Sequence, residues 1–155
     1  MSVETKLTLN SETVAMLQDL IQINLDSRDG FRHAAKSVEE VAVSSMFIQL
    51  AAERDRQAFE LQALVNNNGE TPTHDGSFAA SAHRTWMDIR TAVGGGLVAV
   101  LQEAERGEDY IKGQYESSIK KNPATAVSDV LHRQYAAVKS AHDRIRDMRD
   151  AHAEK

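Results

Sequence analysis

Two glutamates on a long amphipathic stretch are the residues with the clearest potential for chemistry. Apolar residues recur at helical spacing along Leu97–Lys121, and Glu108 falls on their stripe with Glu105 one turn earlier. The stripe consists of Leu101, Ala104, Ile111, Tyr115 and Ile119. A carboxylate on the buried face of a helix needs a cation, a proton or a metal ion, because an unpaired buried charge is too costly. The first question is therefore which residues face Glu105 and Glu108.

Three further stretches have the same helical periodicity, and each has polar residues near its middle. Residues 11–36 carry Asn24 on the apolar stripe and Asp26 beside it, and residues 38–67 carry Arg54 on the stripe with Glu53 beside it. In residues 124–152 the polar positions on the stripe are Gln134 and His142.

The connections between these stretches predict a topology. The breaks at residues 37 and 122–123 are very short, so each flanking pair of helices should form an antiparallel hairpin. Residues 66–96 form a long crossover that contains a fifth, shorter helix over 78–93. Two hairpins joined by one long crossover predict an all-α, ferritin-like four-helix bundle, formed as a single domain over residues 1–155.

Helices of similar length should have their midpoints at similar heights in such a bundle. The midpoints fall near Asn24, Arg54, Glu108 and Val138, with Gln134 one turn before the last of them. We therefore expect Asn24, Arg54, Glu108 and Gln134 to form one buried polar layer.

Ferritin-like bundles place a di-metal site at this height, with a carboxylate from each of two helices and a Glu-x-x-His pair from each of the others. Neither pair is intact, because Arg56 stands where a histidine should follow Glu53 and Lys139 stands where a glutamate should precede His142. The favoured interpretation is that Arg54 or Arg56 supplies the positive charge and pairs with Glu108. The alternative is a surviving site for iron or another divalent metal. Its ligands would be Asp26, Glu53, Glu105, Glu108 and His142.

Composition excludes several other classes of function. Eighteen basic and 23 acidic residues give a formal net charge of -5, which argues against nucleic acid or an anionic membrane as the main partner. There is no cysteine, so thiolate sites and disulfides are excluded. The first ten residues have no apolar core typical of a signal peptide, and no run is long enough to span a membrane, so we expect a cytoplasmic protein.

Several short motifs, spread in order over nearly the whole chain, resemble those of one family. They are Asp29-Gly30-Phe31-Arg32-x-Ala34-Ala35, Arg54 followed by Glu60-Leu61-Gln62, Gly76-Ser77, His83-Arg84-x-Trp86, Glu105-Arg106-Gly107-Glu108-Asp109 with Tyr115, and His142-Asp143. With these the chain resembles a family of small bacterial proteins of unknown function that have a ferritin-like four-helix bundle. The resemblance implies that fold and a bacterial cytoplasmic setting, and it brings no activity.

These observations favour a non-enzymatic structural or interaction protein that self-associates and binds no cofactor, and a stress-linked role is one form of this hypothesis. Its working surface would include His83, Arg84 and Trp86 on the crossover helix. The alternative is a divergent metal-binding protein that uses the helix carboxylates and His142. A DNA-protecting shell is disfavoured, since the chain is acidic and has no basic tail.

Overall fold

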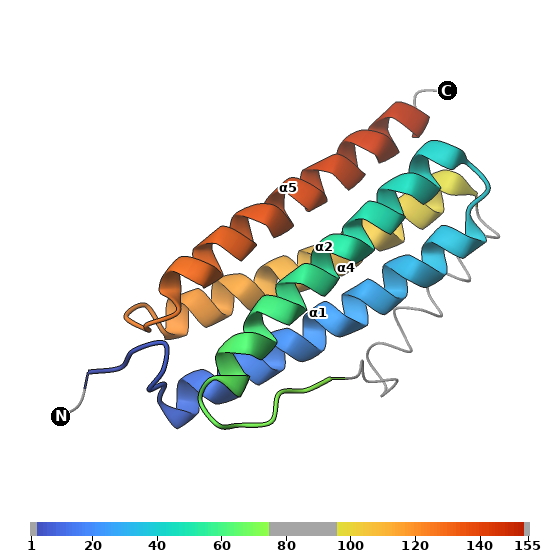
Figure 1. The fold of residues 1–155 in the computed structure, drawn as a ribbon. Coiled ribbons are helices and arrows are strands. Elements are labelled where there is room, and N and C mark those ends of the chain that lie inside the picture. Colours follow the sequence, from blue (N-terminus) through green and yellow to red (C-terminus); the bar gives the residue numbers. More distant parts are fainter. Residues whose placement is uncertain (1–2, 75–95, 154–155) are drawn as a thin grey trace.

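The computed structural model describes residues 3–74 and 96–153, which form four long helices (Figure 1). The helices are α1 (Ser11–Ser37), α2 (Val41–Asn66), α4 (Leu97–Lys121) and α5 (Ser128–Ala153). Over the described residues the chain is all-α, and its only β-type pairing is an isolated bridge between Thr5 and Thr8. None of the four helices combines the length and the apolar character that crossing a membrane requires.

The predicted helix spans agree with the structure except at two starts. The helix predicted to begin at residue 38 begins at Val41, because the Glu40 side chain accepts hydrogen bonds from the amides of Ala42 and Val43 and so caps it there. The helix predicted to begin at residue 124 begins at Ser128, because residues 122–127 form turns after the helix break at Asn122. The span predicted for Leu97–Lys121 matches α4.

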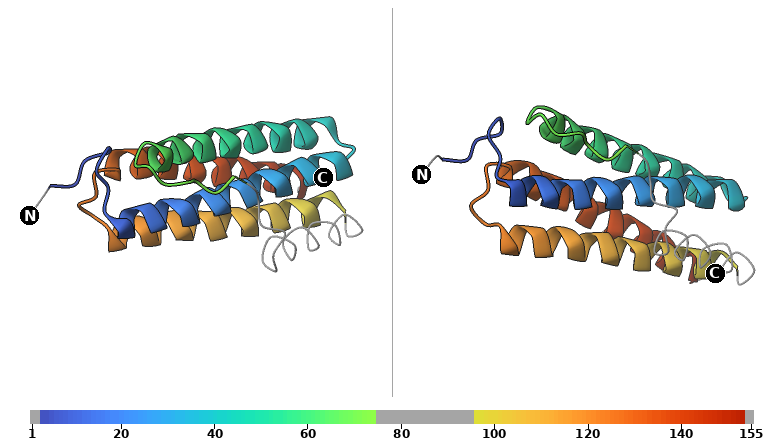
Figure 2. Two further views of the ribbon diagram at one scale, coloured as in Figure 1. Left: turned by 60° about the horizontal axis from the view of Figure 1, so that its bottom comes forward. Right: turned by 90° about the horizontal axis from the view of Figure 1, so that it is seen from below.

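The helices pack as two hairpins, α1 with α2 and α4 with α5, and the hairpins meet through contacts of α1 with α4 and of α2 with α5. The end of α2 and the beginning of α4 lie at opposite ends of the bundle (Figure 2). The connection between them therefore spans the length of the molecule, as the long crossover predicted. The fifth helix expected over residues 78–93 lies outside the described residues.

The core consists of two apolar clusters. One surrounds Leu17, Leu20, Leu61 and Leu131, and the other surrounds Phe31, Phe47, Leu50 and Leu101. On α2 and α4 the residues of the two clusters are separated by buried polar side chains, whereas Asn24 of α1 and Gln134 of α5 lie within the span of the first cluster. The buried polar residues near the helix midpoints are Asn24, Arg54, Gln57, Glu108 and Gln134.

The segment before α1 is held against the rest of the molecule by one carboxylate. Glu4 accepts hydrogen bonds from the amide of Asn10 (2.8 Å), the hydroxyl of Thr13 (2.7 Å) and the amide of Ala126 in the α4–α5 connection (2.9 Å). Burial acts to raise the pKa of Glu4, but the hydrogen bonds from Ala126, Asn10 and Thr13 outweigh it and hold that pKa below its ordinary value. Glu4 therefore links the start of α1 to the second hairpin.

Candidate functional site

An arginine and a glutamate form an ion pair at the centre of the bundle. Arg54 of α2 is fully buried and Glu108 of α4 is 1% exposed, and Arg54 Nη2 donates to Glu108 Oε2. Both residues lie on the apolar stripe of their helix, so the helices cannot fold together without burying them. The pair links the two hairpins and places a guanidinium group in the layer, as the favoured interpretation of the sequence expected, and the arginine is Arg54.

A chain of hydrogen bonds extends from this pair toward the α5 side of the layer. Arg54 Nη1 donates to Gln57 Oε1 at 3.0 Å, and Gln134 of α5 donates to the backbone carbonyl of Gln57 at 3.3 Å. The Gln134 amide also donates to Glu60 Oε1 at 2.8 Å. Glu60 in turn pairs with the exposed side chain of Arg133, so the network connects the buried layer to the surface.

Tyr115 of α4 continues the network to α1. Its hydroxyl donates to Gln134 Oε1 at 2.6 Å and accepts a hydrogen bond from Asn24 Nδ2 at 2.8 Å. Asn24 Nδ2 also donates to the carbonyl of Leu20 at 2.8 Å. The four residues expected in the layer, Asn24, Arg54, Glu108 and Gln134, are thus all buried and bonded, and each of the four described helices contributes one of them.

The low polarity of the interior determines the electrostatics of the layer. Burial raises the pKa of Glu108 above the ordinary glutamate value, and the nearby Arg54 guanidinium offsets only part of this effect. Burial also raises the pKa of Tyr115 to about 12, so its hydroxyl stays protonated and can donate to Gln134. Within the described residues Arg54 Nε and Asn24 Oδ1 are buried without a hydrogen-bond partner. Each buried polar atom without a partner lowers the free energy of unfolding.

A second group of charged residues lies next to the layer, between α4 and α5. Glu105 Oε1 accepts from Arg149, and its other oxygen lies 3.5 Å from His142 Nε2. His142 Nε2 is closer to Asp109 Oδ1, at 2.8 Å, while its Nδ1 lies 3.3 Å from Asp143 Oδ1. This group is partly exposed, and it joins α4 to α5 through the Glu105–Arg149 ion pair and through the contacts of His142 with Glu105 and Asp109.

The five candidate metal ligands do not form one site. Glu53 pairs with Arg144 at 3.2 Å, and Asp26 accepts a hydrogen bond from Gln22 of its own helix at 3.4 Å. Of the five, Glu105 and His142 approach each other, and Glu108 lies near enough to His142 and Glu53 for their charges to affect its pKa. Over residues 3–74 and 96–153 no group of three or more histidine, aspartate or glutamate side chains is arranged to hold a metal ion.

The donor set also fits a metal poorly on chemical grounds. Three of the candidate carboxylates each bind an arginine, and a guanidinium group neither ligates a metal nor loses its proton. The pairs are Glu53–Arg144, Glu105–Arg149 and Glu108–Arg54. The positive charge that a metal ion would bring is thus already supplied by the protein.

Sequence reasoning missed several members of these networks. Gln57 and Tyr115 are one turn and two turns away from the expected layer residues on their own helices, and Tyr115 was counted only as an apolar stripe position. No feature of the sequence around Arg149 predicts that it pairs with Glu105. A buried tyrosine normally bonds its hydroxyl, and this general rule was the available signal for Tyr115.

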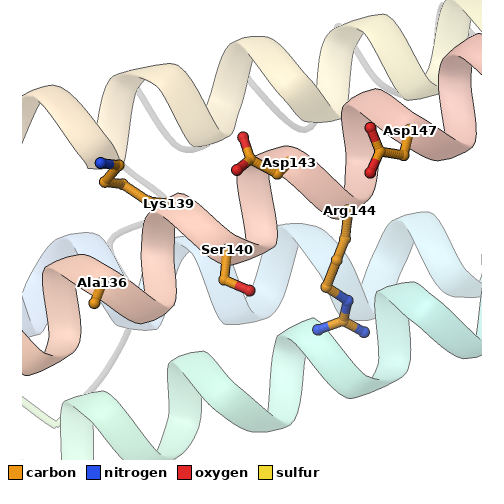
Figure 3. A pocket seen from close by; sticks show the side chains of 6 residues that line it. All are labelled: Ala136, Lys139, Ser140, Asp143, Arg144 and Asp147. Atoms are coloured by element: carbon orange, nitrogen blue, oxygen red, sulfur yellow. The ribbon is translucent and has the colours of Figure 1, made fainter.

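A surface hollow lies on α5, away from the layer. It has a volume of about 500 Å³ and is lined by Ala136, Lys139, Ser140, Asp143, Arg144 and Asp147. Figure 3 shows that all six side chains come from α5, with Arg144 reaching toward α2. An open hollow along a single helix fits a surface contact better than a reaction site. The other surface expected from the sequence, around His83, Arg84 and Trp86, lies outside the described residues.

Comparison with known proteins identifies one family whose model matches most of the chain. The model of a family described as "Domain of unknown function (DUF2383)" matches residues 12–121, which include α1, α2 and α4 with the Arg54–Glu108 pair. No curated protein matches the chain.

Proposed function

The chain belongs to the family described as a domain of unknown function, DUF2383, and from this premise we propose that it is a non-enzymatic, self-associating interaction protein. We propose further that its fold is a ferritin-like bundle in which arginine side chains take the place of metal ions. The observation that carries this proposal is the fully buried Arg54–Glu108 pair at the centre of the bundle.

The connectivity of the helices supports the ferritin-like part of the proposal. Two hairpins joined by an end-to-end connection distinguish such folds from simple up-and-down bundles. The polar residues of the layer lie at the height where ferritin-like bundles carry their metal ligands. In this chain they bond to one another and to arginines, so the layer can stabilise the arrangement of the helices without a cofactor.

The surface chemistry supports an interaction role. The polar groups of the layer are buried and bonded to one another, and the surface hollow on α5 is lined by charged and small side chains. Catalysis needs reactive groups that a substrate can reach, and the bonded, buried groups of this layer do not meet that need. The outer faces of the helices are therefore the working surfaces in this proposal.

Metal content tests the central claim. The protein is purified without chelators from cells supplied with iron, manganese and zinc, and its metals are measured by elemental mass spectrometry. We expect no metal at stoichiometric level and an unfolding curve that does not change when EDTA is added. One metal ion per chain, lost in Glu108→Ala with the fold retained, would overturn the proposal and favour the divergent metal-binding protein.

Self-association is tested separately by sedimentation velocity over a concentration series. We expect the sedimentation coefficient to rise with concentration to the value for a dimer or a larger assembly. A monomer at every concentration up to the millimolar range would contradict this part of the proposal.

A further inference from the structure

The outer face of α2 carries an unusual row of exposed apolar side chains. Val41 is 74% exposed, Ile48 is 58% exposed and Phe59 is 73% exposed, and Ala52 between them is exposed as well. The other large exposed hydrophobics of the described chain are Val3, Leu7 and Tyr110. Since these three lie on other segments, α2 is the only described helix that carries more than one.

The four residues on α2 form one straight stripe. At 3.6 residues per turn, positions 41, 48, 52 and 59 lie within about 40° of one another around the helix axis. The stripe extends over about 27 Å, given a rise of 1.5 Å per residue. It faces away from the bundle, because α2 packs against α1 and α5 through its other sides and lies along the outer edge of the molecule (Figure 2).

The spacing of the stripe matches the pattern by which two helices pair. Positions 41, 45, 48, 52, 55 and 59 alternate steps of four and three residues, and the apolar members occupy the sites that meet a partner helix in a coiled coil. The faces of α2 that meet the bundle are already packed with Phe47, Leu50 and Leu61. The outer stripe is thus a second, separate helix-packing face.

Two charges next to the stripe, between Ala52 and Phe59, indicate what kind of partner fits. Asp55 is half exposed and bonds Arg28 of α1 at 2.9 Å, and the next residue, Arg56, is exposed with no ion-pair partner in the described part of the chain. A face with one acidic and one basic group side by side complements itself when a second copy is turned around. In a parallel pair, identical charges would instead lie opposite one another, which is unfavourable.

We infer that the outer stripe of α2 binds the same stripe of a second copy, in antiparallel orientation about a two-fold axis near residues 53 and 54. This inference rests on the proposed self-association and names its surface. In this register Ile48 packs on Phe59 of the partner subunit, and Ala52 provides room for close approach at the centre. Arg56 comes within about 6 Å along the axis of Asp55 of the partner subunit, which an arginine side chain can span.

Disulfide cross-linking tests the orientation, since the chain has no cysteine of its own. A cysteine introduced as Ala52→Cys lies about 4.5 Å along the axis from its own copy, and one introduced as Val41→Cys lies about 38 Å away. Under mild oxidation we expect Ala52→Cys to form a covalent dimer and Val41→Cys to stay uncross-linked. Equal cross-linking of both variants would indicate a parallel pair and overturn the antiparallel arrangement.

The energetic contribution of the stripe is tested by Phe59→Glu. We expect this variant to raise the dimer dissociation constant by about tenfold or more, measured by sedimentation equilibrium. Tyr110→Glu on α4 is the matched control, because Tyr110 is 58% exposed and lies outside the stripe, and we expect it to leave the dissociation constant unchanged. Circular dichroism verifies that both variants remain folded, since both side chains are largely exposed in the single chain.

The outcomes separate this inference from the proposal on which it rests. A protein that assembles, but whose assembly is insensitive to Phe59→Glu and does not cross-link through Ala52→Cys, overturns the α2 surface while self-association stands. A protein that remains monomeric at every concentration overturns both.

Discussion

At the scale of single residues, the Arg54–Glu108 pair is where stability depends most on one side chain. Both side chains are buried, and replacing only the arginine leaves a carboxylate without a counter-charge. We predict that Arg54→Met lowers the free energy of unfolding by about 3–5 kcal/mol at pH 7, measured by urea denaturation. Methionine keeps most of the side-chain volume, so the loss reflects the charge.

The surface arginine Arg133 provides the matched control. Arg133 also pairs with a glutamate, Glu60, but its side chain is 62% exposed. We expect Arg133→Met to cost about 0–1 kcal/mol, because solvent screens an exposed pair. If Arg54→Met also lowers the free energy of unfolding by less than about 1 kcal/mol, Glu108 does not remain as an unpaired buried charge when its arginine is removed.

The residues of the layer could be expected from the sequence because each interrupts an apolar stripe near the middle of its helix. Their hydrogen-bond and ion-pair partners could not be predicted in the same way. That the Tyr115 hydroxyl donates to the Gln134 amide oxygen, and that Arg149 reaches Glu105, depends on how the helices rotate against each other. That rotation is a property of the packed molecule rather than of any one stretch.

At the scale of elements, helix spans follow the apolar periodicity, and errors occur where a local bond ends or begins a helix. Glu40 caps α2 three residues later than expected, and the turns before Ser128 delay α5. The segment before α1 shows the same limit. Its attachment to the α4–α5 connection depends on Glu4 reaching an amide 122 residues away, and helix periodicity contains no information about such a contact.

This attachment predicts a pH dependence. The folded-state pKa of Glu4 is below its ordinary value of 4.5, so its contribution to stability is present above pH 4.5 and is lost as the pH falls through the folded-state pKa. We predict that Glu4→Gln is less stable than the unmodified protein at pH 7 and that the difference becomes smaller at an acidic pH below 4.5. Urea unfolding at both pH values measures it.

The control for this element is Glu12→Gln, which removes an exposed acidic charge from the first turn of α1. Glu12 accepts none of the hydrogen bonds that Glu4 receives from Asn10, Thr13 and Ala126. Two results would contradict a role for the ionised carboxylate of Glu4. The loss of stability in Glu4→Gln would be equally large at both pH values, or it would be no larger than the loss in Glu12→Gln.

At the scale of the whole molecule, two apolar clusters provide most of the driving force for folding, and the Arg54–Glu108 pair of the polar layer lies between them on α2 and α4. Apolar packing in the clusters is not directional, whereas the hydrogen bonds of the layer require a particular geometry. Its network includes residues from all four helices. We therefore propose that the layer fixes the positions of the helices relative to one another along the bundle axis.

This interpretation predicts that replacing both Arg54 and Glu108 does not lower stability, in contrast to replacing Arg54 alone. Arg54→Met combined with Glu108→Met removes both charges together with the buried, unbonded Arg54 Nε, and it extends the apolar core across the layer. We expect the double variant to recover the stability that Arg54→Met loses and to equal or exceed the unmodified protein by about 1–4 kcal/mol. If the layer fixes the helix heights, amide signals in the NMR spectrum of the double variant should broaden or double despite this gain. A double variant at least as unstable as Arg54→Met would show instead that the layer contributes net stability.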